Sequence, residues 1–249
     1  MLFRSYSTFL QRAWDQIVHD VCQNDQPVLI GVDRAGLVGE DGTSHQGMFT
    51  LTAQRQIPRI IIASPKDEQE LRALVRTALA QDHPFALHYP RDSVTGTAPR
   101  SPELLPIGAA EVLSEGGDIT ILAFGPILQR ALPVIERLRA SGLSVGLVNA
   151  IWASPLDAPL VCRLGRSSSL LVTLEESVVV GGFGSGVLEV LAADEAATGN
   201  PVTASILTIG IPAGTFVDHG SVNDLRALIG LDEEGIERQI RAAWAAHRA

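Results

Sequence analysis

The sequence predicts an α/β protein made of two three-layer domains, each a parallel sheet covered by helices. Short apolar runs rich in β-branched residues alternate with amphipathic segments along the chain, which is typical of parallel sheets with helical crossovers. This alternation is interrupted over residues 92–118, where Pro, Gly, Ser and Thr are frequent. The interruption favours two sheets over one continuous sheet, with domains over residues 1–100 and 118–249 and a linker over 101–117.

The first domain is predicted to hold two helices and three strands. Residues 8–23 form the first helix, because their apolar side chains recur at spacings of three and four. The strands are the branched, apolar runs 27–33, 57–65 and 85–91. A second helix runs to about residue 81, and it is introduced by a capping hydroxyl, a proline and an early acid at Ser64, Pro65 and Asp67.

The second domain repeats the alternation. A short edge strand follows the linker, and longer strands are predicted over residues 118–125, 143–150, 169–177 and 203–210. Helices are predicted over about 127–141, after Gly186, over 221–229 and over 233–247. This pattern matches a second parallel sheet with helices on its faces.

The composition argues for a globular protein with neither a nucleic-acid nor a membrane partner. Hydrophobic residues make up 46% of the 249 residues, and the net charge is −9, whereas a nucleic-acid binder needs a basic face. The same charge disfavours an anionic membrane surface, and no apolar stretch approaches the roughly 20 residues of a membrane span. Cys22 and Cys162 lie in apolar runs and are expected to be reduced core residues. The N-terminal residues lack a signal-peptide pattern, so the expected location is the cytoplasm.

Residues 33–47, DRAGLVGEDGTSHQG, place charged side chains among four glycines directly after a predicted strand. Ligands of open parallel sheets bind beyond the carboxyl ends of the strands, and both Arg34 and Arg91 follow such ends. The guanidinium fork matches phosphate and carboxylate, so the two arginines suggest an anion site. The alternative is that each arginine pairs with a nearby surface acid.

Asp41 and His45, in the same glycine-rich loop, point to proton transfer. A histidine beside an acid and two arginines can exchange protons near neutral pH. A solvated loop histidine is the commoner case, and it stays open as the alternative. The other histidines form no cluster with metal-ligand spacing, so no metal site is predicted.

A second glycine-rich loop, GGFGSG over residues 181–186, follows the strand that ends in Glu175 and Glu176. It does not fit the dinucleotide-binding fingerprint, because Val187 stands where a third glycine is required. A tight strand-to-helix turn is the better interpretation.

Five segments together resemble a known family. They are YSTFLQRAWDQ (6–16), DRAG with its trailing HQG (33–47), HYPR (88–91), GGFGSG (181–186) and IPAGTFVDHGS (211–221). They follow one another as in the 1-deoxy-D-xylulose-5-phosphate synthases of the transketolase superfamily. The resemblance spans essentially the whole chain and implies a partial pyrimidine-binding domain followed by a transketolase C-terminal domain. It also implies thiamine diphosphate as cofactor, Mg²⁺ in the complete enzyme, pyruvate and glyceraldehyde 3-phosphate as substrates, and a homodimer.

The resemblance assigns substrate-handling roles to five residues. Arg34 and Arg91 match the pair that holds the phosphate of the aldehyde substrate, and Tyr6 lies near them. Asp41 and His45 match groups that contact the bound intermediate and relay protons. The resemblance therefore interprets the glycine-rich loop as one that closes an acceptor site.

At the cofactor end the resemblance is incomplete. Phe9 matches the aromatic residue that packs against the aminopyrimidine ring, and Arg12 matches a residue beside that ring. The glutamate that activates the cofactor lies upstream of the YSTF segment in the family, whereas the first glutamate here is Glu40. The GDG motif of the diphosphate-binding domain, which holds magnesium, does not occur in this sequence.

Residues 1–5, MLFRS, also lack the pattern of the strand expected before Tyr6. The chain is therefore expected to be the C-terminal portion of the enzyme, cut inside its pyrimidine-binding domain and inactive alone. Two alternatives stay open. One is a subunit of a split transketolase-like enzyme that a partner chain completes, and the other is a non-catalytic module that binds a phosphate ligand.

Overall fold

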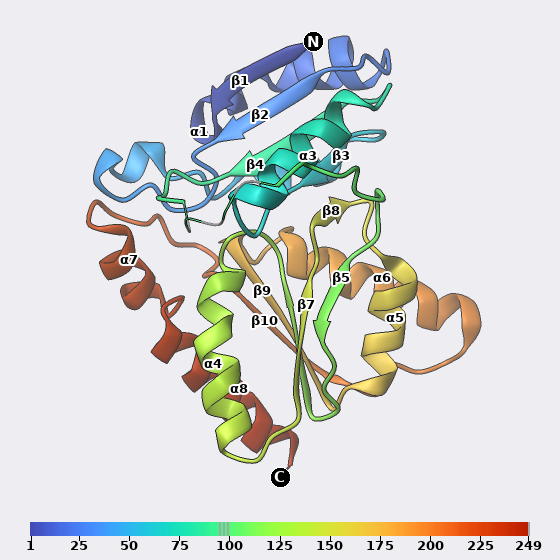
Figure 1. Cartoon of the computed structure of the whole chain (residues 1–249), viewed down its shortest axis with the longest axis vertical. Coiled ribbons are helices and arrows are strands. Elements are labelled where there is room, and N and C mark those ends of the chain that lie inside the picture. The colour runs from blue at the N-terminus through green and yellow to red at the C-terminus, as the bar shows by residue number, and fades with distance from the viewer. Residues whose placement is uncertain (95, 97, 99, 249) are drawn as a thin grey trace.

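The computed structural model describes residues 1–94, 96, 98 and 100–248, which form two five-stranded sheets placed one beyond the other along the molecule (Figure 1). In spatial order, the first sheet contains β1 (Leu2–Tyr6), β2 (Leu29–Asp33), β4 (Phe85–Tyr89), β3 (Ile61–Ala63) and β8 (Trp152–Ser154). The second contains β10 (Ser205–Ile211), β9 (Leu170–Val178), β6 (Ile119–Ala123), β7 (Val145–Asn149) and β5 (Glu111–Ser114). The prediction of an α/β fold with two sheets is confirmed.

Both sheets are parallel except at one edge. β8 pairs with β3 and β5 pairs with β7 in antiparallel fashion, whereas the other pairs are parallel. The strands β2 and β6 are buried along their whole length. Burial on both faces explains why their sequences are continuous apolar runs rather than alternating ones.

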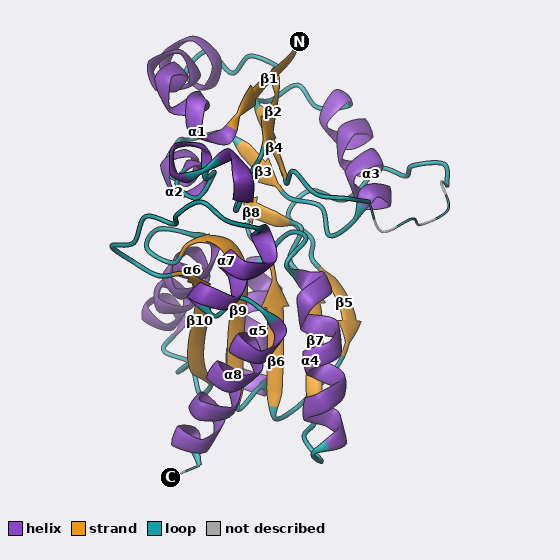
Figure 2. Ribbon diagram, turned by 90° about the vertical axis from the view of Figure 1, so that its left-hand side faces the viewer, coloured by secondary structure: helices purple, strands orange, loops and turns teal. Residues whose placement is uncertain are grey.

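Helices cover both faces of each sheet. Figure 2 shows α3 (Glu68–Leu79) on one side of the first sheet and α1 (Ser7–Leu10) and α2 (Thr50–Arg55) on the other. The second sheet lies between α4 (Leu128–Ala140) with α8 (Glu233–His247) and α5 (Ala158–Ser167) with α6 (Phe183–Thr198) (Figure 1). The short α7 (Val222–Ile229) precedes α8 and contacts the glycine-rich loop of the first domain.

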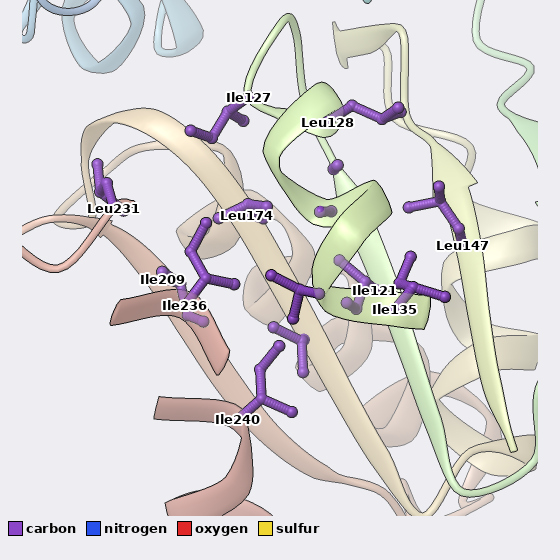
Figure 3. Packing of buried hydrophobic residues seen from close by; sticks show 14 of the residues in the cluster. Ile121, Ile127, Leu128, Ile135, Leu147, Leu174, Ile209, Leu231, Ile236 and Ile240 are labelled. Carbon is purple, nitrogen blue, oxygen red and sulfur yellow. The ribbon is translucent and has the colours of Figure 1, made fainter. Parts of the chain in front are cut away.

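The core of the second domain lies between its sheet and the α4 and α8 helices (Figure 3). Its central side chains are at most 2% exposed and are Ile121, Leu147, Leu174 and Ile209 from strands and Leu128, Ile135, Ile236 and Ile240 from helices. Burying one such side chain contributes about 1.5–3 kcal/mol. The core therefore fixes the strands whose carboxyl ends face the first domain.

Residues 1–5 were expected not to form a strand, and this expectation is wrong. Leu2–Tyr6 is β1, paired in parallel with β2 from Leu2–Leu29 to Tyr6–Asp33. β1 is an edge strand whose first three residues are exposed. Without a buried face there, its sequence carries no alternation to detect.

The single α-helix predicted over residues 8–23 is also wrong in detail. After α1 the chain forms a 3₁₀ turn over Gln11–Ala13 and a π-helical segment over Gln16–Cys22. The hydrogen bonds of a π-helix join residues five apart, and Ile17 and Cys22, which are five apart, are the buried residues of this segment. Both side chains are buried, and Cys22 carries a free thiol, as does Cys162.

Two predicted helix starts are shifted. The N-cap of α3 is Asp67, whose carboxylate accepts Glu70 N at 2.8 Å, whereas the Ser64 hydroxyl donates to His88 O at 3.1 Å. The helix predicted after Gly186 begins at Phe183. In both cases a contact with a residue distant in sequence shifts the start, because Ser64 is engaged by His88 O and the first amides of α6 are engaged by Glu175.

Besides β1, three strands and α-helices were not predicted, namely α2, α5 and β8. β8 returns the chain from the second half of the sequence to the edge of the first sheet, so the two halves interlock. The short edge strand predicted within residues 92–118 is confirmed as β5, which forms one edge of the second sheet, although it lies inside the range assigned to the linker. Residues 95, 97 and 99, near the end of the range predicted as the first domain, lie outside the described residues.

The N-cap of α5 offers a test of how the segment predicted as the linker is held to the second domain. Asp157 accepts Leu160 N at 3.0 Å through one carboxylate oxygen and Ala110 N at 2.9 Å through the other. Asp157→Ala should therefore lower the free energy of unfolding by about 2 kcal/mol. Asp232→Ala is the control, since Asp232 caps only Gly235 N, and about 1 kcal/mol is expected. Urea denaturation measures both, and equal losses would show that the Ala110 contact contributes nothing.

Candidate active site

The loops that carry Arg34 and Arg91 start side by side at the carboxyl edge of the first sheet. β2 and β4 are parallel neighbours in register, with Asp33 opposite Tyr89. Ala35 N donates to Tyr89 O at 3.0 Å, so the chain leaves both strands at one point. This is the edge at which open parallel sheets bind ligands.

Asp41 connects the two arginines, which we call the arginine pair. Its Oδ2 accepts Arg34 Nε at 3.0 Å, and its Oδ1 forms an ion pair with Arg91 Nη1. The hydrogen bond from Arg34, assisted by that from Arg91, lowers the pKa of Asp41 below its usual value despite partial burial. One carboxylate thus bridges two guanidinium groups from different loops.

Arg34 is held in an unusual conformation. Its φ is +60°, a left-handed backbone region that costs a non-glycine residue about 1–2 kcal/mol. Its Nη1 lies 2.9 Å from Asp33 Oδ2, and the same oxygen accepts Arg4 Nε at 3.2 Å. These contacts fix the position of the Arg34 guanidinium group, which the strained backbone directs away from the sheet. Sequence reasoning did not identify Arg4, because the segment around it showed no strand pattern.

Aromatic rings support the same guanidinium group. Arg34 Cζ lies 3.8 Å from the centroid of the Tyr6 ring, a cation–π contact. Tyr6 stacks on Phe9 at 5.8 Å between centroids, and His45 meets Phe9 edge-on at 5.1 Å. Arg12 Cζ lies 5.5 Å from the Phe9 centroid. Phe9 remains 37% exposed, so part of its ring is open to a ligand.

The structure therefore brings all seven predicted site residues into one connected set. Their order is Arg12, Phe9, Tyr6, Arg34, Asp41 and Arg91, with His45 on Phe9. They come from three segments of sequence, and their functional roles remain predictions.

The glycine-rich loop is closed at its base by backbone hydrogen bonds. Gly36 N donates to Gly47 O at 3.1 Å, and Gly47 N donates to Gly36 O at 2.7 Å. A Cβ at Gly47 would collide with Arg34 O, so only glycine fits there. The loop therefore presents Arg34, Asp41 and His45 from a fixed base.

The second domain anchors the first part of this loop. Glu176 Oε1 accepts Leu37 N at 3.1 Å, and its Oε2 accepts Arg226 Nε at 2.7 Å. Gln46 accepts Val38 N at 2.8 Å and donates to Asp218 O at 2.9 Å. Sequence reasoning did not assign these residues to the site. For Glu176 a signal was present, because an acidic residue stands at the end of a buried strand.

The GGFGSG loop encloses a carboxylate of its own chain. Glu175 is fully buried, pairs with the Ser177 hydroxyl, and accepts Phe183 N and Gly184 N at 2.7 Å each. Burial raises the pKa of Glu175 to about 7. Arg55 of α2 donates to the carbonyls of residues 181 and 182 at 2.7 and 2.8 Å. The loop is thus a strand-to-helix turn between β9 and α6 that contacts the first domain through Arg55, and the predicted turn is confirmed.

A cavity of about 360 Å³ lies at the seam between the domains. Its charged lining includes Lys66, Arg130 and Arg226. Lys66 pairs with Glu70 and Glu111. Arg130 pairs with Glu233, and Arg226 pairs with Glu176. Among the described residues, the cavity therefore offers no cation that lacks an acidic partner.

The described residues contain neither a candidate metal cluster nor a candidate membrane span. No group of three or more His, Cys, Asp or Glu side chains there is arranged to hold a metal ion. No helix in the described part is both long and apolar enough to cross a membrane.

Comparison with known domain families gives two matches. Residues 4–97 match the pyrimidine-binding domain of transketolase, and residues 108–236 match the transketolase C-terminal domain. The first match covers the first sheet except for β8, and the second match covers β8 together with the second sheet.

Curated relatives carry a more specific name. The chain is 43% identical over 238 residues to a 1-deoxy-D-xylulose-5-phosphate synthase of Aquifex aeolicus and 44% identical over 242 residues to one of Listeria innocua. Each alignment covers 96% of this chain but 37% of the relative. The chain thus spans little more than a third of the length of the curated relatives that it matches.

Solved structures show the same architecture. A split-gene transketolase, described as an inactive β4 tetramer, superposes with a TM-score of 0.82 at 26% identity and covers 98% of this chain and 75% of its own. A transketolase variant from Pichia stipitis superposes with a TM-score of 0.74 at 18% identity over 99% of this chain and 34% of its own. The second likeness supports the fold alone.

Proposed function

Since the chain belongs to the transketolase family, as both domain matches show, we propose that it is the acceptor-binding portion of a thiamine diphosphate-dependent transferase. The reaction we propose joins pyruvate to glyceraldehyde 3-phosphate and yields 1-deoxy-D-xylulose 5-phosphate and carbon dioxide. The observation that carries this proposal is the convergence of Arg34 and Arg91 on one anionic group beside an open aromatic ring. The names of the curated relatives support it.

The arginine pair is assigned to the phosphate of the acceptor. A guanidinium group donates two parallel hydrogen bonds to phosphate, and two groups from neighbouring loops enclose it from two sides. Tyr6 fixes the plane of the Arg34 guanidinium by stacking, and Asp33 fixes its position. The acceptor's aldehyde then projects toward the side of the loop that carries His45.

Thiamine diphosphate fits the exposed aromatic ring at this site. Phe9 is partly open and flanked by the Arg12 guanidinium, which suits packing against a planar aminopyrimidine. When bound, the cofactor supplies a nucleophilic carbon that stabilises the negative charge left by decarboxylation. Mg²⁺ is proposed to bind with the cofactor's diphosphate, through ligands outside the matched segment.

His45 is assigned to proton transfer. Its Nδ1 lies 3.0 Å from the Ser44 hydroxyl, and its ring edge packs on Phe9, so the imidazole is oriented between cofactor and acceptor positions. A histidine there can donate a proton to the aldehyde oxygen as the new carbon–carbon bond forms. Asp41 is the nearby group that balances the charge of the arginine pair before the acceptor arrives.

The diphosphate-binding domain and the activating glutamate are proposed to come from outside these 249 residues. The relatives are more than twice as long as the matched segment, which leaves room for both. They can belong to the same polypeptide or to a separate subunit, and the likeness to a split-gene transketolase supports the second arrangement. A homodimer in the cytoplasm remains the expected assembly and location.

Reconstitution tests this proposal. The chain alone, with thiamine diphosphate, Mg²⁺ and both substrates, is expected to consume no pyruvate above a heat-killed control. A fusion to the part of the Aquifex aeolicus relative that this chain does not match should produce 1-deoxy-D-xylulose 5-phosphate. Product formed by the chain alone would refute the proposal that the diphosphate-binding domain and the activating glutamate come from outside these 249 residues. A folded fusion that binds thiamine diphosphate but forms no product would favour the non-catalytic phosphate-binding module.

A further inference from the structure

The carboxylate of Asp41 lies where the proposed function requires the acceptor's phosphate. Its two oxygens take one hydrogen bond from Arg34 and one from Arg91. Two guanidinium groups directed at two oxygens of one anion are also the arrangement that holds a phosphate. An incoming phosphate must therefore take over contacts that Asp41 already makes.

The segment around Asp41 can move without disturbing the sheet. Gly39 is fixed against the second domain, since a Cβ there would lie 3.0 Å from Gly220 O. Gly42 has φ +85° and open space around its α-carbon. Residues 40–44 are exposed or half-buried and form only two short 3₁₀ turns. Rotation of the backbone between these glycines, with Gly39 packed in place and Gly42 free to turn, therefore carries the carboxylate away while the base of the loop stays in place.

We propose that Asp41 sets the specificity of the acceptor site by occupying the arginine pair until a phosphate dianion displaces it. This inference rests on the proposed function and deepens it. A phosphate dianion carries more charge than the carboxylate and offers three oxygens to the two guanidinium groups. A monocarboxylate carries no more charge than the Asp41 carboxylate, and an unphosphorylated aldehyde carries none. Neither should therefore displace Asp41 from the arginine pair.

Anion binding by the full 249-residue chain tests the proposal without any catalytic readout. Calorimetric titration at pH 7.5 and constant ionic strength would compare inorganic phosphate with acetate. Asp41→Asn keeps the shape of the side chain and removes its charge. If Asp41 occupies the pair about nine-tenths of the time, this variant should bind phosphate roughly 10-fold more tightly than the parent. It should also bind acetate measurably, which the parent should not.

Glu40→Gln is the matched control, because Glu40 is an exposed acid one residue away. It removes the same charge but should change phosphate affinity less than about twofold, because solvent and salt screen an exposed charge. Circular dichroism and the thermal midpoint check that each variant is folded, and Asp41→Ala serves if the Asn variant is not.

Arg91→Ala separates the inference from the proposed function. If phosphate binding depends on Arg91 but Asp41→Asn binds phosphate no more tightly than the parent, Asp41 only positions the arginines and the inference is wrong. If no protein shows Arg91-dependent phosphate binding, the phosphate site itself fails and the inference falls with it.

Discussion

In a complete enzyme that carries this sequence, Arg91→Ala or Arg34→Ala should weaken use of glyceraldehyde 3-phosphate by roughly 10- to 100-fold. A hydrogen bond to a charged group contributes about 1.5–3 kcal/mol, and each variant removes at least one from the phosphate. The Michaelis constant for pyruvate should change little, since neither guanidinium group is assigned to it. Steady-state kinetics with each substrate varied separately measures both effects.

The two arginines should not behave identically. Arg91 is nearly half exposed and contacts Asp41, so its removal affects mainly the phosphate. Arg34 is largely buried, stacks on Tyr6 and pairs with Asp33, so Arg34→Ala should also disturb the loop. Lysine at position 91 should rescue only part of the loss, because a point charge cannot replace the bidentate fork.

Two further variants sharpen the kinetic test. His45→Ala should lower turnover more than acceptor affinity, as expected for a group that acts on the reacting atoms. Arg238→Ala, an exposed arginine on α8, should leave both constants unchanged. If the variants of the arginine pair keep full acceptor affinity, or impair pyruvate and acceptor alike, the phosphate assignment is wrong.

Prediction from the sequence was most reliable for strands that are buried along their whole length and for the residues that directly follow them. β2 and β6 are continuous apolar runs, and their burial on both faces is the reason that they were detectable. Arg34 was found because it follows such a strand, and its link to Arg91 follows from parallel strands sharing a carboxyl edge. Phe9 and Tyr6 were assigned through family resemblance, since nothing local distinguishes them from ordinary surface aromatics.

Features that depend on contacts across the seam were not predictable. β8 has three residues, too few for a period, and its place in the first sheet depends on chain folding that no local pattern records. Glu176 and Arg226 show their role only when the second domain meets the loop at Leu37. The glycines of the GGFGSG loop were recognised as a turn, but the buried Glu175 that requires them was not.

That buried carboxylate makes Gly182 the most sensitive glycine of the turn. Gly182 is extended, so its own backbone tolerates a side chain. A Cβ there would nevertheless collide with Glu175 Oε2 and with Val178 O. Gly182→Ala should therefore lower the free energy of unfolding at pH 8 by about 3–4 kcal/mol, because overpacking is added to lost hydrogen bonds. Gly117→Ala is the matched control, since no atom lies within 4 Å of its Cβ position, and a change within about 0.5 kcal/mol is expected.

The pH dependence of the stability lost in Gly182→Ala identifies the cause of that loss. Burial raises the pKa of Glu175 from 4.5 to about 7, so the folded protein retains this proton at pH 5 and loses it by pH 8. The stability that the group contributes is complete below its unfolded pKa and disappears as the pH rises through about 7. The ionised carboxylate at pH 8 depends more on Phe183 N and Gly184 N than the neutral acid does, because hydrogen bonds to charged groups are stronger. Gly182→Ala should consequently cost about 1 kcal/mol less at pH 5 than at pH 8 in denaturant titrations. An equal cost at both pH values would mean that the methyl group disturbs the backbone at Val178 and not the carboxylate.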